Sequence, residues 1–97
     1  MYFGPENFCI FMKGEFGIDV REEEVGEETT YLLKEELSIE EAWTYDFPYE
    51  VRVDYCNVTV EGQEWIIGVV HEMVESIPLL LIATKNGNLS VVKKPSI

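Results

Sequence analysis

Hydrophobic residues recur with different periods in the two halves of this 97-residue chain. Near the N-terminus, Phe8, Phe11 and Met12 are three or four positions apart, and Pro5 precedes them. This spacing is typical of an amphipathic helix, and proline is favoured in the first turn of a helix. The pattern therefore predicts a helix from Pro5 that ends by Gly17, with a strand over the same apolar residues as the alternative.

The middle of the chain predicts further short helices. Asp19 with Glu22, and Ser38 with Glu41, have the spacing of a capping box, in which two side chains satisfy backbone N–H groups of the first turn. Apolar residues within 31–43 then recur at helical spacing, until the next proline forbids continuation. These expected helices are rich in glutamate.

The hydrophobic period changes to two in the second half. Between residues 49 and 55, apolar and charged residues alternate, which is the pattern of a half-buried strand. Val58 and Val60 fall on the opposite parity, so we expect a β-bulge near residues 56–57. Three further strands and a hairpin turn are expected, over Glu64–Val74, Leu79–Thr84 and Leu89–Lys93 with the turn at Asn86-Gly87.

Together these elements predict one α+β domain over residues 1–97. We expect short acidic helices in the N-terminal half, packed on a three- to four-stranded antiparallel β-meander. The composition is consistent with a single packed core, since 46% of the residues are hydrophobic and the length is that of one domain.

Acidic residues strongly outnumber basic ones. Nineteen Asp and Glu against seven Lys and Arg give a formal net charge of −12. A nucleic-acid-binding domain normally carries a basic patch, and a protein that binds anionic membranes carries clustered Lys or Arg. The charge therefore argues against direct binding of either. The acids concentrate between Asp19 and Asp46, where eleven acids and two bases leave −9.

The sequence also predicts where the protein works. The N-terminal segment lacks the basic start and small-residue cleavage site of a secretory signal, and the longest apolar run, Ile77–Ala83, is too short to cross a bilayer. We therefore expect a cytoplasmic protein. In that compartment Cys9 and Cys56 are expected to be buried free thiols rather than a disulfide.

Residue types that support catalysis are scarce. His71 is the only histidine, so His71-Glu72 cannot supply the two histidines of an H-E-x-x-H zinc site. No glycine-rich phosphate loop is present, and neither cysteine has the electropositive surroundings of a nucleophile. We expect no enzyme activity, no metal and no cofactor.

The acidic stretch is the main functional signal. On a helix, carboxylates four positions apart, such as Glu24 and Glu28, lie about 5–6 Å from each other and repel, so stability does not explain them. We interpret the row as an imitation of the phosphates along a nucleic-acid strand, with a solubilising face as the alternative. The expected partner-binding acids are Glu22, Glu23, Glu24, Glu27, Glu28, Glu35, Glu36, Glu40, Glu41, Asp46, Glu50, Asp54 and Glu75.

A second signal is aromatic. Trp43, Tyr45, Phe47 and Tyr49 occupy alternating positions between the expected last helix and first strand. We expect them mainly to form core between those two elements. The alternative is a partly exposed protein-binding hot spot among acids, because Tyr and Trp dominate such sites.

In size and charge the chain resembles small phage-borne DNA mimics, including uracil-DNA glycosylase inhibitors and some anti-restriction and anti-CRISPR proteins. In two glycosylase-inhibitor families a Glu-Ser-Ile tripeptide enters the DNA groove of the enzyme, and Glu75-Ser76-Ile77 matches it here. The match covers these three residues, lies late in the chain, and is followed by Pro78. The resemblance implies that Glu75, Ser76 and Ile77 contact a partner.

These observations predict a small acidic inhibitor of the DNA-mimic type. Its expected partner is a basic protein, a nucleic-acid-processing enzyme whose groove it occupies, and it is expected to act as a monomer or dimer. The alternatives are an immunity or antitoxin protein that neutralises a basic toxin such as a nuclease, and a regulatory or structural subunit of a larger complex.

Overall fold

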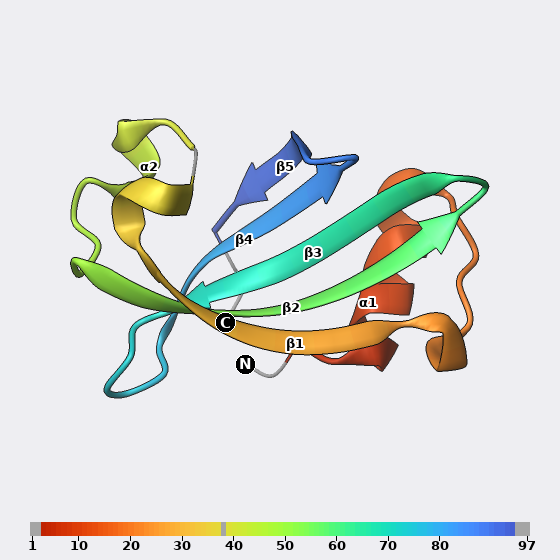
Figure 1. Cartoon of the computed structure of the whole chain (residues 1–97), viewed down its shortest axis with the longest axis horizontal. Coiled ribbons are helices and arrows are strands. Elements are labelled where there is room, and N and C mark those ends of the chain that lie inside the picture. The colour runs from red at the N-terminus through yellow and green to blue at the C-terminus, as the bar shows by residue number, and fades with distance from the viewer. Residues whose placement is uncertain (1–2, 38, 95–97) are drawn as a thin grey trace.

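The computed structural model describes residues 3–37 and 39–94. Five strands form one antiparallel sheet in chain order, which confirms the α+β class and the meander but gives more strands than the three or four expected. Figure 1 shows the sheet as a twisted ribbon with short helices at its two ends. The strands are β1 (Gly26–Leu33), β2 (Glu50–Val60), β3 (Gln63–His71), β4 (Pro78–Lys85) and β5 (Asn88–Lys93).

The N-terminal helix α1 (Pro5–Phe11) is present as expected, with Pro5 in its first turn. It continues into a π-helical turn, η1 (Met12–Phe16), and ends at Gly17, whose φ of 68° is the left-handed conformation that glycine adopts without strain. Helix α1 buries Phe8 completely against the sheet. Among the described residues, no helix is both long and apolar enough to span a bilayer.

The acidic middle of the chain is mostly not helical, contrary to our expectation. Residues Gly26–Leu33 form strand β1, which pairs with β2 from Gly26 opposite Asn57 to Leu33 opposite Glu50. Thr29, Thr30 and Tyr31 favour extended backbone, and pairing with β2 outweighs the helical preference of the surrounding glutamates.

Only short helical turns flank β1: η2 (Glu22–Glu24), η3 (Lys34–Leu37) and α2 (Glu41–Thr44). Before η2 only half of a capping box forms, and it uses Arg21 and Glu24 in place of the expected Asp19 and Glu22: the Glu24 carboxylate accepts a hydrogen bond from the Arg21 amide at 3.4 Å. Ser38, expected to cap a helix, lies outside the described residues.

The expected bulge in β2 is absent, because β2 pairs in continuous register with both neighbours. The parity change has another cause. Val51 belongs to a cluster on one face of the sheet, whereas Cys56 and Val58 belong to a cluster on the other face. We call these the α2 face and the α1 face, after the helix on each side; on the α2 face the packing side chains come from η3 and from Ile39 and Phe47, which flank α2.

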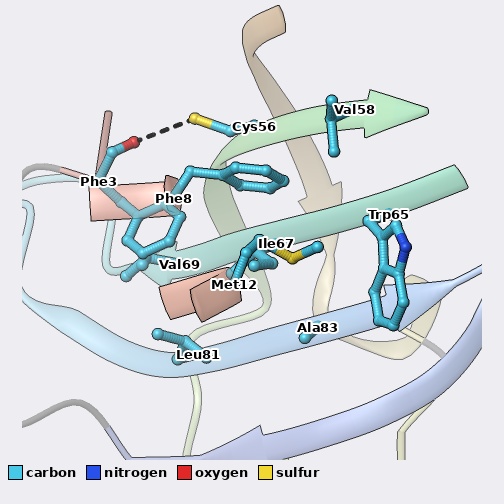
Figure 2. Close-up of a cluster of buried hydrophobic side chains, with 10 residues drawn as sticks. All are labelled: Phe3, Phe8, Met12, Cys56, Val58, Trp65, Ile67, Val69, Leu81 and Ala83. Atoms are coloured by element: carbon cyan, nitrogen blue, oxygen red, sulfur yellow. Dashed lines mark hydrogen bonds between the residues drawn. The ribbon is translucent and has the colours of Figure 1, made fainter. Parts of the chain in front are cut away.

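The larger cluster lies between α1 and the sheet (Figure 2). Figure 2 shows Phe8 and Met12 over β3 beside Ile67, and the Cys56 thiol reaching the carbonyl oxygen of Phe3 at 3.6 Å. Phe16 packs against the ring of Trp65, with 4.6 Å between ring centroids. The cluster's buried members are Phe3, Phe8, Met12, Cys56, Val58, Trp65, Ile67, Val69, Leu81 and Ala83.

The smaller cluster lies on the α2 face, at the opposite end of the sheet. Its buried members are Val51, Val70 and Leu80, and half-buried side chains from η3 and the α2 segment, Leu37 and Phe47 among them, pack on it. The two helical segments therefore cover opposite faces at opposite ends of one sheet.

The expected hairpin turn at Asn86-Gly87 is present, and the β2–β3 hairpin has a turn of the same kind. At Asn86-Gly87 both residues have positive φ, 51° and 81°, and Glu61-Gly62 repeats this with 50° and 79°. Such two-residue turns fit the twist of a hairpin. Strand β3 ends at His71, earlier than the expected Val74, and residues 72–77 form a loop.

Candidate protein-binding site

The ends of four strands meet at the α2 end of the sheet. Leu33 at the end of β1 lies opposite Glu50 at the start of β2, and His71 at the end of β3 lies opposite Pro78 at the start of β4. The loops that leave these strands, residues 34–49 and 72–77, are therefore neighbours at one pole of the molecule. Figure 1 shows the 72–77 loop projecting beyond the sheet there.

This pole carries most of the exposed apolar surface. Of nine exposed large hydrophobic side chains in the described part of the chain, seven lie here, while Ile10 on α1 and Leu89 on β5 lie elsewhere. Val74 is 89% exposed and Tyr45 is 78% exposed. We call the seven residues the aromatic tip: Tyr31, Trp43, Tyr45, Tyr49, Met73, Val74 and Ile77.

The expectation that the aromatic run forms core is therefore wrong for most of its members. Only Phe47 packs on the α2-face cluster, whereas Trp43, Tyr45 and Tyr49 are exposed. The reason is that the chain at 43–47 makes a helical turn and a bend, so the alternating positions do not share one buried face. The hot-spot alternative agrees with this exposure.

Hydrogen bonds fix the backbone of residues 43–49, which we call the aromatic segment. The Lys34 ammonium donates to the carbonyl oxygens of Tyr45 and Phe47, both at 3.4 Å. The amide of Phe47 donates to the carbonyl oxygen of Thr44 at 2.9 Å, and Thr44 itself is buried. A basic side chain within the acidic segment thus acts on local structure, which the sequence alone did not indicate.

The 72–77 loop is also internally bonded. The Glu72 carboxylate accepts hydrogen bonds from the amides of Val74 and Glu75, and the Glu72 amide donates to the carbonyl oxygen of Ile77 at 2.9 Å. Because the backbone is closed in this way, Val74 is presented to solvent by a defined turn. A preordered loop loses less conformational entropy when it binds.

A polar network on the α1 face supports the same loop. Arg52 donates to the Ser76 hydroxyl at 3.0 Å and forms an ion pair with Asp54 at 3.2 Å. The other Asp54 oxygen accepts from Thr29 at 2.8 Å, and the ring of His71, only 1% exposed, lies 3.4 Å from Asp54. Asp54 and Ser76, both expected to contact a partner, thus have structural bonds in this network.

The expected helical row of carboxylates does not exist, because β1 is extended. Glu27 and Glu28 are adjacent in β1 and point to opposite faces, and Glu28 accepts a hydrogen bond from the Tyr55 hydroxyl at 2.9 Å. Glu22, Glu23 and Glu24 lie in η2, beyond the other end of β1, away from the aromatic tip.

The remaining expected acids do gather around the aromatic tip, from η3, α2, the start of β2 and the 72–77 loop. Glu36 also accepts a hydrogen bond from the Leu33 amide at 2.8 Å. All seven are exposed: Glu35, Glu36, Glu40, Glu41, Asp46, Glu50 and Glu75.

The two thiols are free. Burial is the main reason that the pKa of Cys56 is raised to about 11, with the nearby Glu27 carboxylate adding to it. Burial and the acids of η2 also raise the pKa of Cys9. Both thiols are therefore mainly protonated at neutral pH, which disfavours thiolate chemistry. Within residues 3–37 and 39–94, no three His, Cys, Asp or Glu side chains gather as metal ligands.

Comparisons with protein-family models, curated proteins and solved structures found no match to this chain.

Proposed function

We propose that this protein is a small acidic inhibitor that binds the basic, nucleic-acid-binding groove of a partner enzyme through the aromatic tip. One observation carries the proposal: the exposed Tyr, Trp and aliphatic side chains cluster at one pole, and seven exposed carboxylates surround them. An apolar centre within a charged rim is the usual arrangement of a protein-binding hot spot.

The two parts of this surface have different roles. The rim carboxylates attract a basic surface and speed the encounter, and they replace the phosphates that the groove normally holds. The aromatic and aliphatic side chains supply affinity once water is excluded, because Tyr and Trp bury large areas at little entropic cost. Val74 and Tyr45, the most exposed members, are the expected anchors.

The partner is expected to be a protein rather than a nucleic acid. A net charge of −12 repels phosphates, and the same charge is attracted to the lysines and arginines of a nucleic-acid-binding groove. Supporting evidence comes from the hydrogen bonds of Lys34 and Glu72, which order both loops before any partner binds.

The test is inhibition of a panel of purified nucleic-acid-processing enzymes, including nucleases, glycosylases and restriction enzymes. For an enzyme that is inhibited, the double variant Tyr45→Ser, Val74→Ser is expected to weaken inhibition by about 100-fold, since loss of a hot-spot anchor costs about 2 kcal/mol or more. Ile10→Ser, an exposed position on α1, is the matched control and retains full inhibition.

Charge is tested separately with two triple variants that remove the same three charges. Glu40→Gln, Asp46→Asn, Glu75→Gln alters the tip, and Glu22→Gln, Glu23→Gln, Glu24→Gln alters η2 at the other end. The tip variant should associate more slowly and with a flatter salt dependence, and the η2 variant should change less. Equal effects would show that only net charge matters, and no inhibition across the panel would contradict the proposal.

A further inference from the structure

A second surface lies on the α2 face, away from the aromatic tip. The η3 and α2 segments cover this face only at their own end of the sheet, and α1 covers the opposite face at the other end. In Figure 1 the strands that lie in front of α1 have no helix in front of them. Of the two quarters that no helical segment covers, the one on the α1 face carries the polar network of Arg52 and Asp54, whereas the one on the α2 face is apolar.

The uncovered area is an apolar groove beside η3. Val53 and Tyr55 of β2, Ile66 and Gly68 of β3, and Ile82 of β4 line it. Its volume of about 270 Å³ lies below the range of about 300–1,000 Å³ that is usual for small-molecule pockets. The groove is thus better suited to the side chains of a polypeptide than to an enclosed metabolite.

The charges beside the groove are acidic. Glu36 lines it, and the Glu28 carboxylate is bonded to the hydroxyl of Tyr55, another lining residue. None of the described residues in the lining is a lysine or an arginine. A second copy of this chain would bring another net charge of −12 to the same place, so self-association through the groove is disfavoured.

From this arrangement we propose that the groove docks an amphipathic helix of a partner protein, with an apolar stripe on the sheet and Lys or Arg residues beside Glu28 and Glu36. A helix fits because helices already cover the two other apolar quarters of this sheet, and helix on sheet is a stable layer arrangement. The groove shares Glu36 with the rim of the aromatic tip but none of the seven tip residues, and the proposal does not depend on the inhibitor role.

The probe is a synthetic peptide of about 14 residues, four helical turns, built from Leu and Lys with the leucines on one face. A scrambled peptide of the same composition has the same charge but no apolar stripe. Binding is followed by amide chemical shifts of the isotopically labelled protein. The amphipathic peptide should bind about tenfold tighter than the scrambled one, because burial of even one aliphatic side chain is worth that much. Its shifts should centre on Ile66, Gly68 and Ile82.

Ile66→Thr should abolish the preference for the amphipathic peptide, since threonine keeps the β-branched shape but lacks the apolar contact. Val74→Thr in the 72–77 loop makes the same change at the aromatic tip and should leave the preference intact. Four outcomes would overturn the proposal. Two concern affinity: both peptides bind equally, or the preference survives in Ile66→Thr. The other two concern location: the chemical shifts are confined to the β1 edge and η2, or the protein forms a dimer that buries the groove. Loss of enzyme inhibition by the tip variants would leave it untouched.

Discussion

The two ends of the sheet are built differently. At the α1 end, ten buried residues from the N-terminal segment and three strands form one cluster, and Phe8 and Met12 are fully buried. At the α2 end the hydrophobic cluster has only three buried members, and half-buried side chains surround them. The exposed aromatic and aliphatic residues also gather at that second end. The α1 end therefore stabilises the fold, whereas the α2 end leaves apolar residues exposed, on the surface that we propose binds a partner.

Truncation of a large side chain at each end gives the largest expected contrast. Phe8→Ala should lower the free energy of unfolding by about 3–5 kcal/mol, because Phe8 is fully buried and leaves a cavity under α1. Phe47→Ala, at the half-buried cluster, should cost less than about 2 kcal/mol. Urea unfolding of both variants measures the difference, and equal losses would contradict the comparison.

A pair of glycines tests where packing is tight. A Cβ at Gly68 would lie 3.1 Å from Tyr55 Cβ and 3.1 Å from Val53 Cγ1, so Gly68→Ala should destabilise the protein by about 1–3 kcal/mol. Gly14 in η1 has open space around it, and Gly14→Ala should stabilise by about 0.5–1 kcal/mol. Thermal unfolding shows whether the two shifts have opposite signs.

The order of the aromatic segment is expected to depend on Lys34. Lys34→Met removes the ammonium that donates to the carbonyl oxygens of Tyr45 and Phe47, and should reduce stability by about 1 kcal/mol. Amide hydrogen exchange should accelerate within residues 39–49 and stay unchanged in β3. Lys13→Met is the control: it removes an exposed ion pair with Asp19, and should cost only a few tenths of a kcal/mol. Similar exchange in both variants would show that Lys34 is dispensable.

Local sequence rules predicted the elements that local chemistry determines. Pro5 and Gly17 bound the N-terminal helical segment, and the residues of the Asn86-Gly87 turn adopt the positive φ that a tight hairpin needs. Strand β1 was missed because glutamates favour helix and the pairing partner, β2, is distant in sequence: even the nearest pair, Leu33 and Glu50, is 17 residues apart. The apparent bulge in β2 was a consequence of tertiary structure: two layers cover opposite faces, so the apolar side of one straight strand changes along its length.

The site was predictable only in part, for a related reason. Alternation of Trp43, Tyr45 and Tyr49 with polar residues marked an unusual segment, but alternation does not say which residues another layer covers. The partner-binding acids were predicted from the acidic stretch as a whole. The structure places the acids of η2 far from those of α2. The groove around Gly68 left no pattern in the sequence, since it exists only where a covering layer stops.

The last expected effect appears only at alkaline pH and concerns the tightly packed end. Burial raises the pKa of Cys56 to about 11 in the folded protein, above the ordinary value of 9.0 that the unfolded chain should show. The neutral thiol is the form that the fold favours, so its contribution is complete below pH 9 and is lost as pH rises from 9 through 11. Tyr55 has a raised pKa, mainly from its hydrogen bond to Glu28, and contributes with the same sign, so the wild type alone cannot separate the two.

Urea unfolding of wild type and Cys56→Ala at several pH values isolates the thiol. The stability advantage of the wild type should be constant from pH 7 to 8.5 and shrink above pH 9. An advantage that stays constant to pH 11 would mean that water reaches the thiol beneath α1, and that the α1 end is less tightly closed than its packing indicates.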